Sequence, residues 1–258
     1  MNYTEKLAKR ISSVGGGLCV GLDPRPDRIG KGSVEEIGEF VRGIIRETAE
    51  FTAVFKPNVA YFEALGWEGV KMLEEVRSEI PSDIPVILDA KRGDIGETQK
   101  YYAKSAFERY EADAITLNPF MGADTLEPFL EYSDKGLYLL AVTSNAGSSD
   151  IQRRKLADSE GCQNVYELVT QMTSERDGIG LVVGLTNASE VLPRIPDVPL
   201  LIPGLGAQGG DLSVLAGQGR KAPNVVNVSR GVIFPEGKSP REAAEDFLQQ
   251  IRGQLGAV

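Results

Sequence analysis

The feature that most constrains the fold is an eightfold alternation of short apolar segments with helical segments along the chain. The apolar segments are rich in β-branched residues, as buried parallel strands are, and each is followed by helical periodicity. They begin near residues 18, 53, 85, 113, 137, 179, 198 and 224. Because no composition break suggests a linker, the 258 residues favour one α/β domain over 1–258, a (β/α)8 or TIM barrel, rather than an open doubly wound sheet.

Helical patterns complete this prediction. An N-terminal helix from Tyr3 to Ser13 is expected to cover the bottom of the barrel. Ser33, followed by Glu36 three residues on, forms a capping-box pattern that indicates a helix start. The long polar connection 146–161 is predicted to be a mobile lid. Other helices are expected near 61–80, 95–110, 123–132, 164–173, 188–192, 208–216 and 240–255.

Polar residues gather where the predicted strands end, and barrel enzymes build their sites on that face. The densest group is Asp89, Lys91 and Asp94 after the third strand. Residues two apart on a strand share a face, so Asp89 and Lys91 should project together, with Asp94 beyond a turn at Gly93. The other strand ends carry Asp23, Lys56, Asn58, Asn118, Thr143, Ser144, Gln208, Ser229 and Arg230. Any one of them could be a cap or a solvated side chain, but their convergence on one rim predicts a reactive site.

Composition excludes several kinds of chemistry. The chain has no histidine, so proton transfer must use Lys, Asp, Glu, Tyr or Cys. A net charge of −9 argues against a nucleic-acid partner. Cys19 and Cys162 provide neither a disulfide framework nor a metal cluster. Lacking a long apolar run and a signal-peptide core, the protein is expected to be cytoplasmic and not to bind membranes.

The segment Gly204-Leu205-Gly206-Ala207-Gln208-Gly209 satisfies the glycine pattern of a dinucleotide fold. That interpretation also requires an acidic residue about 20 positions later, and none occurs between Asp211 and Glu236. Glycine amides after the seventh barrel strand, together with Ser229-Arg230-Gly231 after the eighth, instead favour a phosphate site. Arg230 could bind a phosphate there through two parallel hydrogen bonds. A glycine-rich turn without a ligand is the remaining alternative.

Several of these motifs together are similar to one enzyme family. Asp89-x-Lys91-x-x-Asp94, Lys56 on the preceding strand, Gly21-Leu22-Asp23-Pro24, Pro203-Gly204 and Ser229-Arg230 resemble orotidine 5′-phosphate decarboxylase. The resemblance extends from the first strand to the eighth, and Phe55-Lys56-Pro57-Asn58 looks like the second, longer bacterial branch. It implies conversion of orotidine 5′-phosphate to uridine 5′-phosphate and CO2 in pyrimidine biosynthesis. It further implies that no metal or organic cofactor takes part.

The resemblance also assigns roles to residues. Lys91 would protonate the C6 carbanion, and Lys56, Asp89 and Asp94 would complete an alternating charge array. The implied substrate-binding residues are Asp23, Asn58 and Thr98 for the ribose, Ser144 for the pyrimidine edge, Gln208 with Arg230 for the phosphate, and Ile95, Pro203 and Ser229 around them. The family's homodimer implies that Asp94, Ile95 and Thr98 complete the neighbouring subunit's pocket.

Two alternatives stay open at this point. The first is a magnesium-dependent sugar-phosphate decarboxylase or aldolase on the same barrel, which needs a further carboxylate ligand; Glu63 is the nearby candidate. The second is a non-catalytic protein that binds a phosphate ligand. A binder has no need of four clustered charges at Lys56, Asp89, Lys91 and Asp94, because burying such charges is unfavourable.

Overall fold

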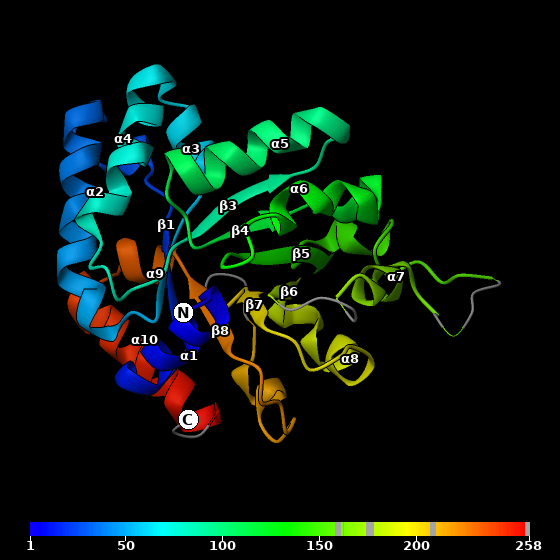
Figure 1. Cartoon of the computed structure of the whole chain (residues 1–258). Coiled ribbons are helices and arrows are strands. Elements are labelled where there is room, and N and C mark those ends of the chain that lie inside the picture. The colour runs from blue at the N-terminus through cyan, green and yellow to red at the C-terminus, as the bar shows by residue number, and fades with distance from the viewer. Residues whose placement is uncertain (158–160, 162, 174–177, 207–209, 256–258) are drawn as a thin grey trace.

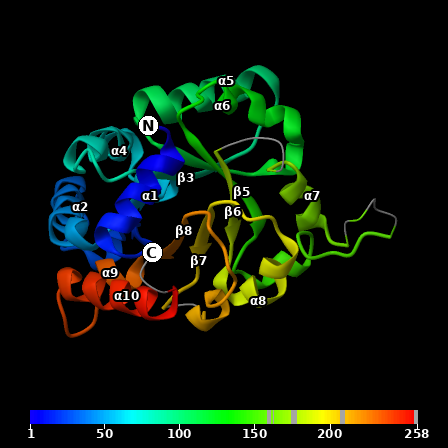
Figure 2. The same ribbon diagram turned by 60° about the horizontal axis from the view of Figure 1, so that its bottom comes forward.

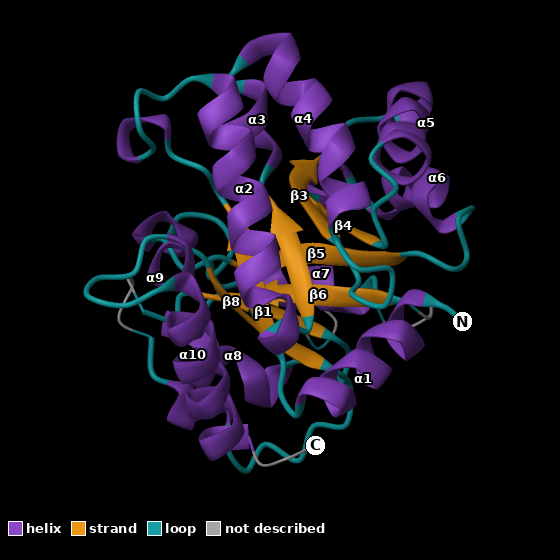
Figure 3. Ribbon diagram, turned by 90° about the vertical axis from the view of Figure 1, so that its left-hand side faces the viewer, coloured by secondary structure: helices purple, strands orange, loops and turns teal. Residues whose placement is uncertain are grey.

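Eight parallel strands form the centre of the molecule, with helices packed around them (Figures 1 and 3). The computed structural model describes residues 1–157, 161, 163–173, 178–206 and 210–255. The strands are β1 (Leu18–Leu22), β2 (Val54–Pro57), β3 (Ile87–Arg92), β4 (Ala114–Leu117), β5 (Gly136–Val142), β6 (Ile179–Val183), β7 (Leu200–Pro203) and β8 (Asn224–Val228). All eight predicted strands are therefore present.

The sheet closes into a barrel. Its strand order is β2-β1-β8-β7-β6-β5-β4-β3, with every neighbouring pair parallel. Two single bridges, Phe55 with Val86 and Asn58 with Asp89, then join β2 to β3 across the remaining gap. The prediction of a (β/α)8 barrel is confirmed, and all strand C-termini lie on one face.

The helices alternate with the strands and cover the outside of the barrel. They are α1 (Tyr3–Val14), α2 (Val34–Thr48), α3 (Val59–Glu63), α4 (Gly66–Glu79), α5 (Gly96–Lys104), α6 (Glu127–Leu130), α7 (Val165–Gln171), α8 (Ala188–Val191), α9 (Arg230–Ile233) and α10 (Pro240–Leu255). The capping box predicted at Ser33 is present, because Ser33 and Glu36 each accept a hydrogen bond from the other's backbone N–H. None of the described helices is both long enough and apolar enough to cross a membrane.

Helix α1 lies across the bottom of the barrel, as expected (Figure 2). Its buried residues Tyr3, Leu7 and Ile11 share one apolar cluster with residues inside the barrel. The Tyr3 hydroxyl lies 3.0 Å from the hydroxyl of Tyr138 on β5, and both side chains are buried. This end of the barrel is therefore closed by packing, which leaves the C-terminal end of the strands for a site.

Several predicted helix boundaries are wrong. The helix expected over 61–80 is divided into α3 and α4, because the chain turns at Gly66, where φ is +74°. Beyond α5 the helix widens into a π-helical stretch over Ser105–Arg109, closed by a bond from Tyr110 N to Ser105 O. Within 208–216 the described part forms only a 3₁₀ turn, Leu212–Leu215, capped by Asp211.

The predicted lid 146–161 is described except for 158–160. Its first turn, Ala146–Ser149, is a 3₁₀ helix, and Gln152 accepts a hydrogen bond from the backbone of Thr143 at 2.8 Å. Lys155 forms an antiparallel bridge with Asn164, so the connection folds back toward α7. The mobility of this connection stays a prediction.

Candidate active site

Lys56 and Asp89 meet at the barrel mouth because β2 and β3 are the two strands that close the barrel. Lys56 lies near the end of β2, and the bridge between Asn58 and Asp89 aligns the two strand ends. The Lys56 ammonium donates to Asp89 Oδ2 at 2.6 Å, and both side chains are almost fully buried. This ion pair is therefore part of the wall of the barrel interior.

Lys91 approaches the same carboxylate from the other side. Its Nζ lies 2.5 Å from Asp89 Oδ1, and 47% of its side chain is exposed. Asp89 consequently lies between two ammonium groups, one buried and one open to the cavity. The prediction that Asp89 and Lys91 project together is confirmed, but not through regular strand geometry: β3 continues to Arg92, and Lys91 has a left-handed backbone with φ +48°.

The charges of this group shift one another's protonation equilibria. Burial alone raises the pKa of Asp89, but Lys56 and Lys91 outweigh burial and hold that pKa well below its usual range. Burial lowers the pKa of Lys56, but Asp89 and then Asp23 outweigh it and raise that pKa. Both groups are therefore charged at neutral pH. Burial raises the pKa of the nearby Cys19 thiol to about 12, so this cysteine is neutral and unsuited to proton transfer.

A cavity of about 380 Å³ opens directly above these charges. Besides Asp89, five predicted residues line it, namely Lys56, Lys91, Thr143, Ser144 and Pro203. Apolar side chains of the barrel interior, Leu140, Val182 and Leu201, line another part of it. The cavity thus combines an apolar lining with a small set of charged groups, as ligand sites do.

The remaining predicted residues occupy the rim in different ways. Asp23 follows β1, and its buried Oδ1 has no hydrogen-bond partner among the described residues. Asn58 caps α3 through a bond from Ala60 N to its Oδ1 at 3.1 Å.

Ser229 lies against Gly21, and its buried hydroxyl is also unpartnered within the described chain. Arg230 begins α9 and is exposed. Gln208 lies outside the described residues.

Asp94, Ile95 and Thr98 do not join the charge group of their own chain. Ile95 and Thr98 are exposed, and Asp94 Oδ1 accepts a bond from Ile95 N at 2.8 Å. Within the described residues Asp94 has no ion pair, whereas the array implied by the family resemblance has four members. A single chain therefore assembles three of the four charges, Lys56, Asp89 and Lys91.

Two polar residues inside the strands that line the cavity were missed from the sequence. Thr116 on β4 donates to Asp89 Oδ1 at 3.0 Å, and Asn227 on β8 accepts a bond from Cys19 Sγ at 3.4 Å through its Oδ1. Both lie inside strands, whereas only strand ends were considered. The available signal was a polar residue at an inward position of an otherwise apolar strand, as in Ala114-Ile115-Thr116-Leu117.

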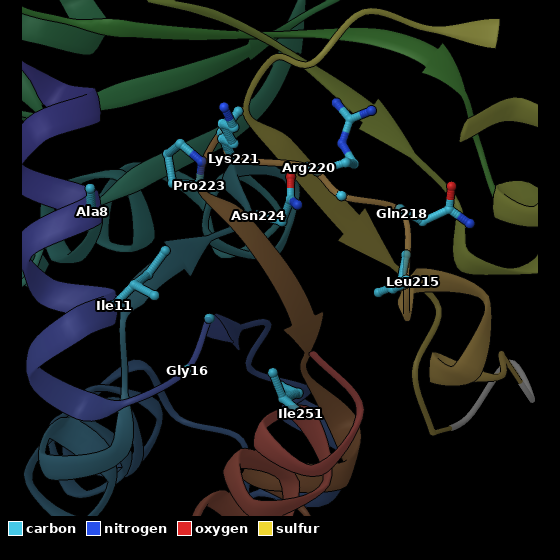
Figure 4. A pocket seen from close by; sticks show the side chains of 14 residues that line it. Ala8, Ile11, Gly16, Leu215, Gln218, Arg220, Lys221, Pro223, Asn224 and Ile251 are labelled. Atoms are coloured by element: carbon cyan, nitrogen blue, oxygen red, sulfur yellow. The ribbon is translucent and has the colours of Figure 1, made fainter. Parts of the chain in front are cut away.

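A second cavity, of about 280 Å³, lies at the opposite end of the barrel (Figure 4). It is lined partly by Ile11, Leu215 and Ile251, and none of the described residues that line it has a carboxylate side chain. The guanidinium of Arg220 is bound to the backbone oxygens of Pro196 and Val198 at 2.7 and 3.0 Å. Without a carboxylate this cavity lacks the alternating charges found at the mouth, so we place the candidate active site at the C-terminal end.

Comparisons with known proteins agree with this geometry. Residues 16–247 match the family described as "Orotidine 5′-phosphate decarboxylase / HUMPS family". An orotidine 5′-phosphate decarboxylase of Verminephrobacter eiseniae is 45% identical, with 98% of this chain and 95% of the relative covered. One from Herpetosiphon aurantiacus is 41% identical over 95% and 96% of the two chains. The structure of Leishmania donovani OMP decarboxylase is similar with a TM-score of 0.86 and 37% identity, over 98% of each chain.

Proposed function

The chain belongs to the orotidine 5′-phosphate decarboxylase / HUMPS family, and we propose that it converts orotidine 5′-phosphate to uridine 5′-phosphate and CO2. The observation that carries the proposal is the Asp89 carboxylate held between two ammonium groups, at 2.6 and 2.5 Å, beside the cavity at the barrel mouth. In this role the protein supplies uridine 5′-phosphate for pyrimidine biosynthesis. We expect this reaction to take place in the cytoplasm.

The charge arrangement suits the chemistry of this decarboxylation. Loss of CO2 from C6 leaves a carbanion in the plane of the pyrimidine ring, where the ring's π system cannot delocalise it. An ammonium beside C6 stabilises this negative charge and then donates a proton to it. Lys91 is the group for both tasks, because its ammonium is open to the cavity while that of Lys56 is buried against Asp89. Orotidine 5′-phosphate thus loses CO2 and gains one proton.

The other charges hold and orient this donor. Asp89 binds both ammonium groups, so Lys91 is preorganised before the substrate enters. Asp89 would also lie near the departing carboxylate, and their repulsion is relieved as CO2 leaves; we rank this effect below carbanion stabilisation. Arg230, exposed at the end of β8, is available for the phosphate, and Asp23 and Asn58 for the ribose.

The structure favours this reaction over the magnesium-dependent alternative for a specific reason. That alternative needs Glu63 as a metal ligand near Asp89. Glu63 lies on α3, and its Oε1 accepts a bond from Arg92 Nη2 at 2.8 Å, so its carboxylate is already neutralised by a guanidinium. A metal ion at this position would have to displace Arg92.

Protein treated with EDTA is expected to consume orotidine 5′-phosphate at the rate of untreated protein, because the chemistry needs no metal. The decrease in absorbance of the substrate measures the rate, and chelator-treated protein with added Mg²⁺ is the control. Activity that disappears with EDTA and returns with Mg²⁺ would support the metal-dependent alternative. Binding of the nucleotide without turnover would support the non-catalytic one.

We further propose that the active protein is a homodimer in which Asp94 completes the neighbouring subunit's charge array. Asp94 has no ion pair within the described part of its own chain, and the segments that follow β3 and β4 carry exposed apolar residues. These are Ile95 and Tyr101 around α5 and Phe120 and Met121 after β4. Exposed apolar groups of this size are typical of protein–protein interfaces.

Mixing two inactive variants tests this shared site. Lys91→Ala and Asp94→Ala are each expected to be nearly inactive, but a mixed dimer contains one site with both residues intact. After subunit exchange at equal concentrations, about a quarter of wild-type activity should return, because half the dimers are mixed and each has one intact site. Each variant put through the exchange alone is the control. If activity does not return although mixed dimers form, the shared site is refuted.

A further inference from the structure

We infer that Thr116 is a positioning residue, which holds the backbone of Lys91 in the conformation that directs its ammonium toward Asp89. Thr116 lies on β4 and is 1% exposed. Only the expected effect of Thr116 on the reaction rate rests on the proposed function, because the contacts of Thr116 exist without a substrate. No sequence motif pointed to this residue.

One hydroxyl makes three hydrogen bonds at this position. Thr116 Oγ1 accepts from the backbone N–H groups of Ala90 and Lys91, each at 3.0 Å, and donates to Asp89 Oδ1 at 3.0 Å. A hydroxyl has one donor and two acceptor lone pairs, so its whole hydrogen-bonding capacity is used. All three partners lie within the segment 89–91, which carries the reactive carboxylate and the proton donor.

The backbone of β3 needs such a partner because its pairing with β4 is interrupted here. β3 advances from Leu88 to Arg92 while β4 advances only from Ile115 to Leu117. The extra residues form a bulge, and their amides do not bond to the carbonyls of the neighbouring strand as they would in a regular pair. Thr116, located between Ile115 and Leu117, provides the missing acceptor through its side chain.

Lys91 also adopts a backbone conformation that requires support. Its φ of +48° is in the left-handed region, which is unfavourable for a residue with a Cβ. Among the described residues other than glycine, only Lys91 and Glu111 have a positive φ. Such backbones persist where the surroundings hold them, and they cluster at active sites. Without the Thr116 hydroxyl, Lys91 can relax toward ordinary strand geometry and its ammonium moves away from the reacting carbon.

The variants that test this are Thr116→Val, which keeps the shape but removes the hydroxyl, and Thr116→Ser, which keeps the hydroxyl. Thr48→Val is the matched control, because Thr48 is also fully buried and donates its hydroxyl to Ile44 O at 2.7 Å, but on α2. If Thr116→Val does not give folded protein, Thr116→Cys replaces it, since a thiol is only a weak hydrogen-bonding group.

We expect Thr116→Val to lower kcat on the order of 100-fold with little change in KM, because a shift of about 1 Å in a reacting group can have this effect. Thr116→Ser should restore most of kcat, and Thr48→Val should lower the melting temperature without lowering kcat. A Thr116→Val enzyme with normal kcat would overturn the inference. So would a Thr116→Ser enzyme that is as slow as Thr116→Val.

Hydrogen exchange of the Ala90 and Lys91 amides, measured by NMR on the free protein, tests their hydrogen bonds to Thr116 without any substrate. Both amides should exchange faster in Thr116→Val than in wild type or Thr116→Ser. Unchanged exchange in Thr116→Val would overturn the positioning role of Thr116 even if the enzyme decarboxylates orotidine 5′-phosphate. Conversely, a wild-type protein that leaves this nucleotide unchanged would refute the proposed function, and the exchange measurement would still decide on Thr116.

Discussion

Replacement of Lys91 by alanine is expected to lower kcat at least about 10⁴-fold, because a positioned general acid contributes about 10²–10⁴ and electrostatic stabilisation about 10²–10³. The affinity for uridine 5′-phosphate should change little. Lys91 lies at the edge of the cavity with 47% of its side chain exposed, and its ammonium is directed to Asp89 rather than to the rim where a phosphate would bind. Single-turnover rates and calorimetric titration with the product measure the two quantities.

Arg230→Ala is the contrasting variant. Arg230 is exposed at the start of α9, which follows β8, so its loss should weaken nucleotide binding. The expected loss in kcat/KM corresponds to about 2–5 kcal/mol, as for removal of one partner of a hydrogen-bonded charge pair. If Lys91→Ala turns over normally, the proton-donor assignment is wrong. If Arg230→Ala keeps a normal kcat/KM, the phosphate assignment is wrong.

Replacement of Asp89 by asparagine is expected to lower the free energy of unfolding at pH 7 by about 3–5 kcal/mol, because it leaves the buried Lys56 ammonium without its counter-charge. Lys56 and Asp89 are both nearly fully buried, so solvent does little to screen the loss. Urea unfolding of the two proteins measures this difference. Asp246→Asn is the control: its ion pair with Lys238 is largely exposed, and its loss should cost less than about 1 kcal/mol.

The effect of Asp89→Asn should depend on pH in a definite direction. The pKa of Asp89 is lowered in the folded protein, while in the unfolded chain it is about 3.9. The unfolded state therefore binds more protons between these two values, and the stabilisation by Asp89 is complete above pH about 4. It decreases as the pH falls through the pKa of the folded state. A difference between wild type and variant that grows on acidification would contradict the burial of this ion pair.

The sequence was sufficient to predict the barrel, because the local strand and helix patterns and the polar residues at the strand ends point to the same fold. Eight apolar strand patterns with helices between them leave few alternatives, and Asp89 and Lys91 are close in sequence as well as in space. The pairing of Lys56 with Asp89 was implied only by family resemblance. It arises from the closure of β2 on β3, a contact between distant segments that periodicity does not specify.

The contacts that hold Asp89 and Lys91 in place could not be predicted from the sequence. The left-handed backbone at Lys91 and its bonds to Thr116 depend on a register shift between β3 and β4, and a residue such as lysine gives no local signal for positive φ. The helix boundaries failed for a related reason. Gly66 and the π-helical stretch after α5 are local departures within segments whose overall periodicity is helical.

The most direct test of the central claim is a crystal structure of the protein with bound uridine 5′-phosphate, in which the distance from Lys91 Nζ to C6 of the pyrimidine is measured. We expect a distance of about 3–3.5 Å, the separation of reacting atoms in a productive complex. Asp89 should remain bound to the Lys91 ammonium. The account is contradicted if C6 lies beside another group, or if the nucleotide occupies the cavity at the opposite end of the barrel.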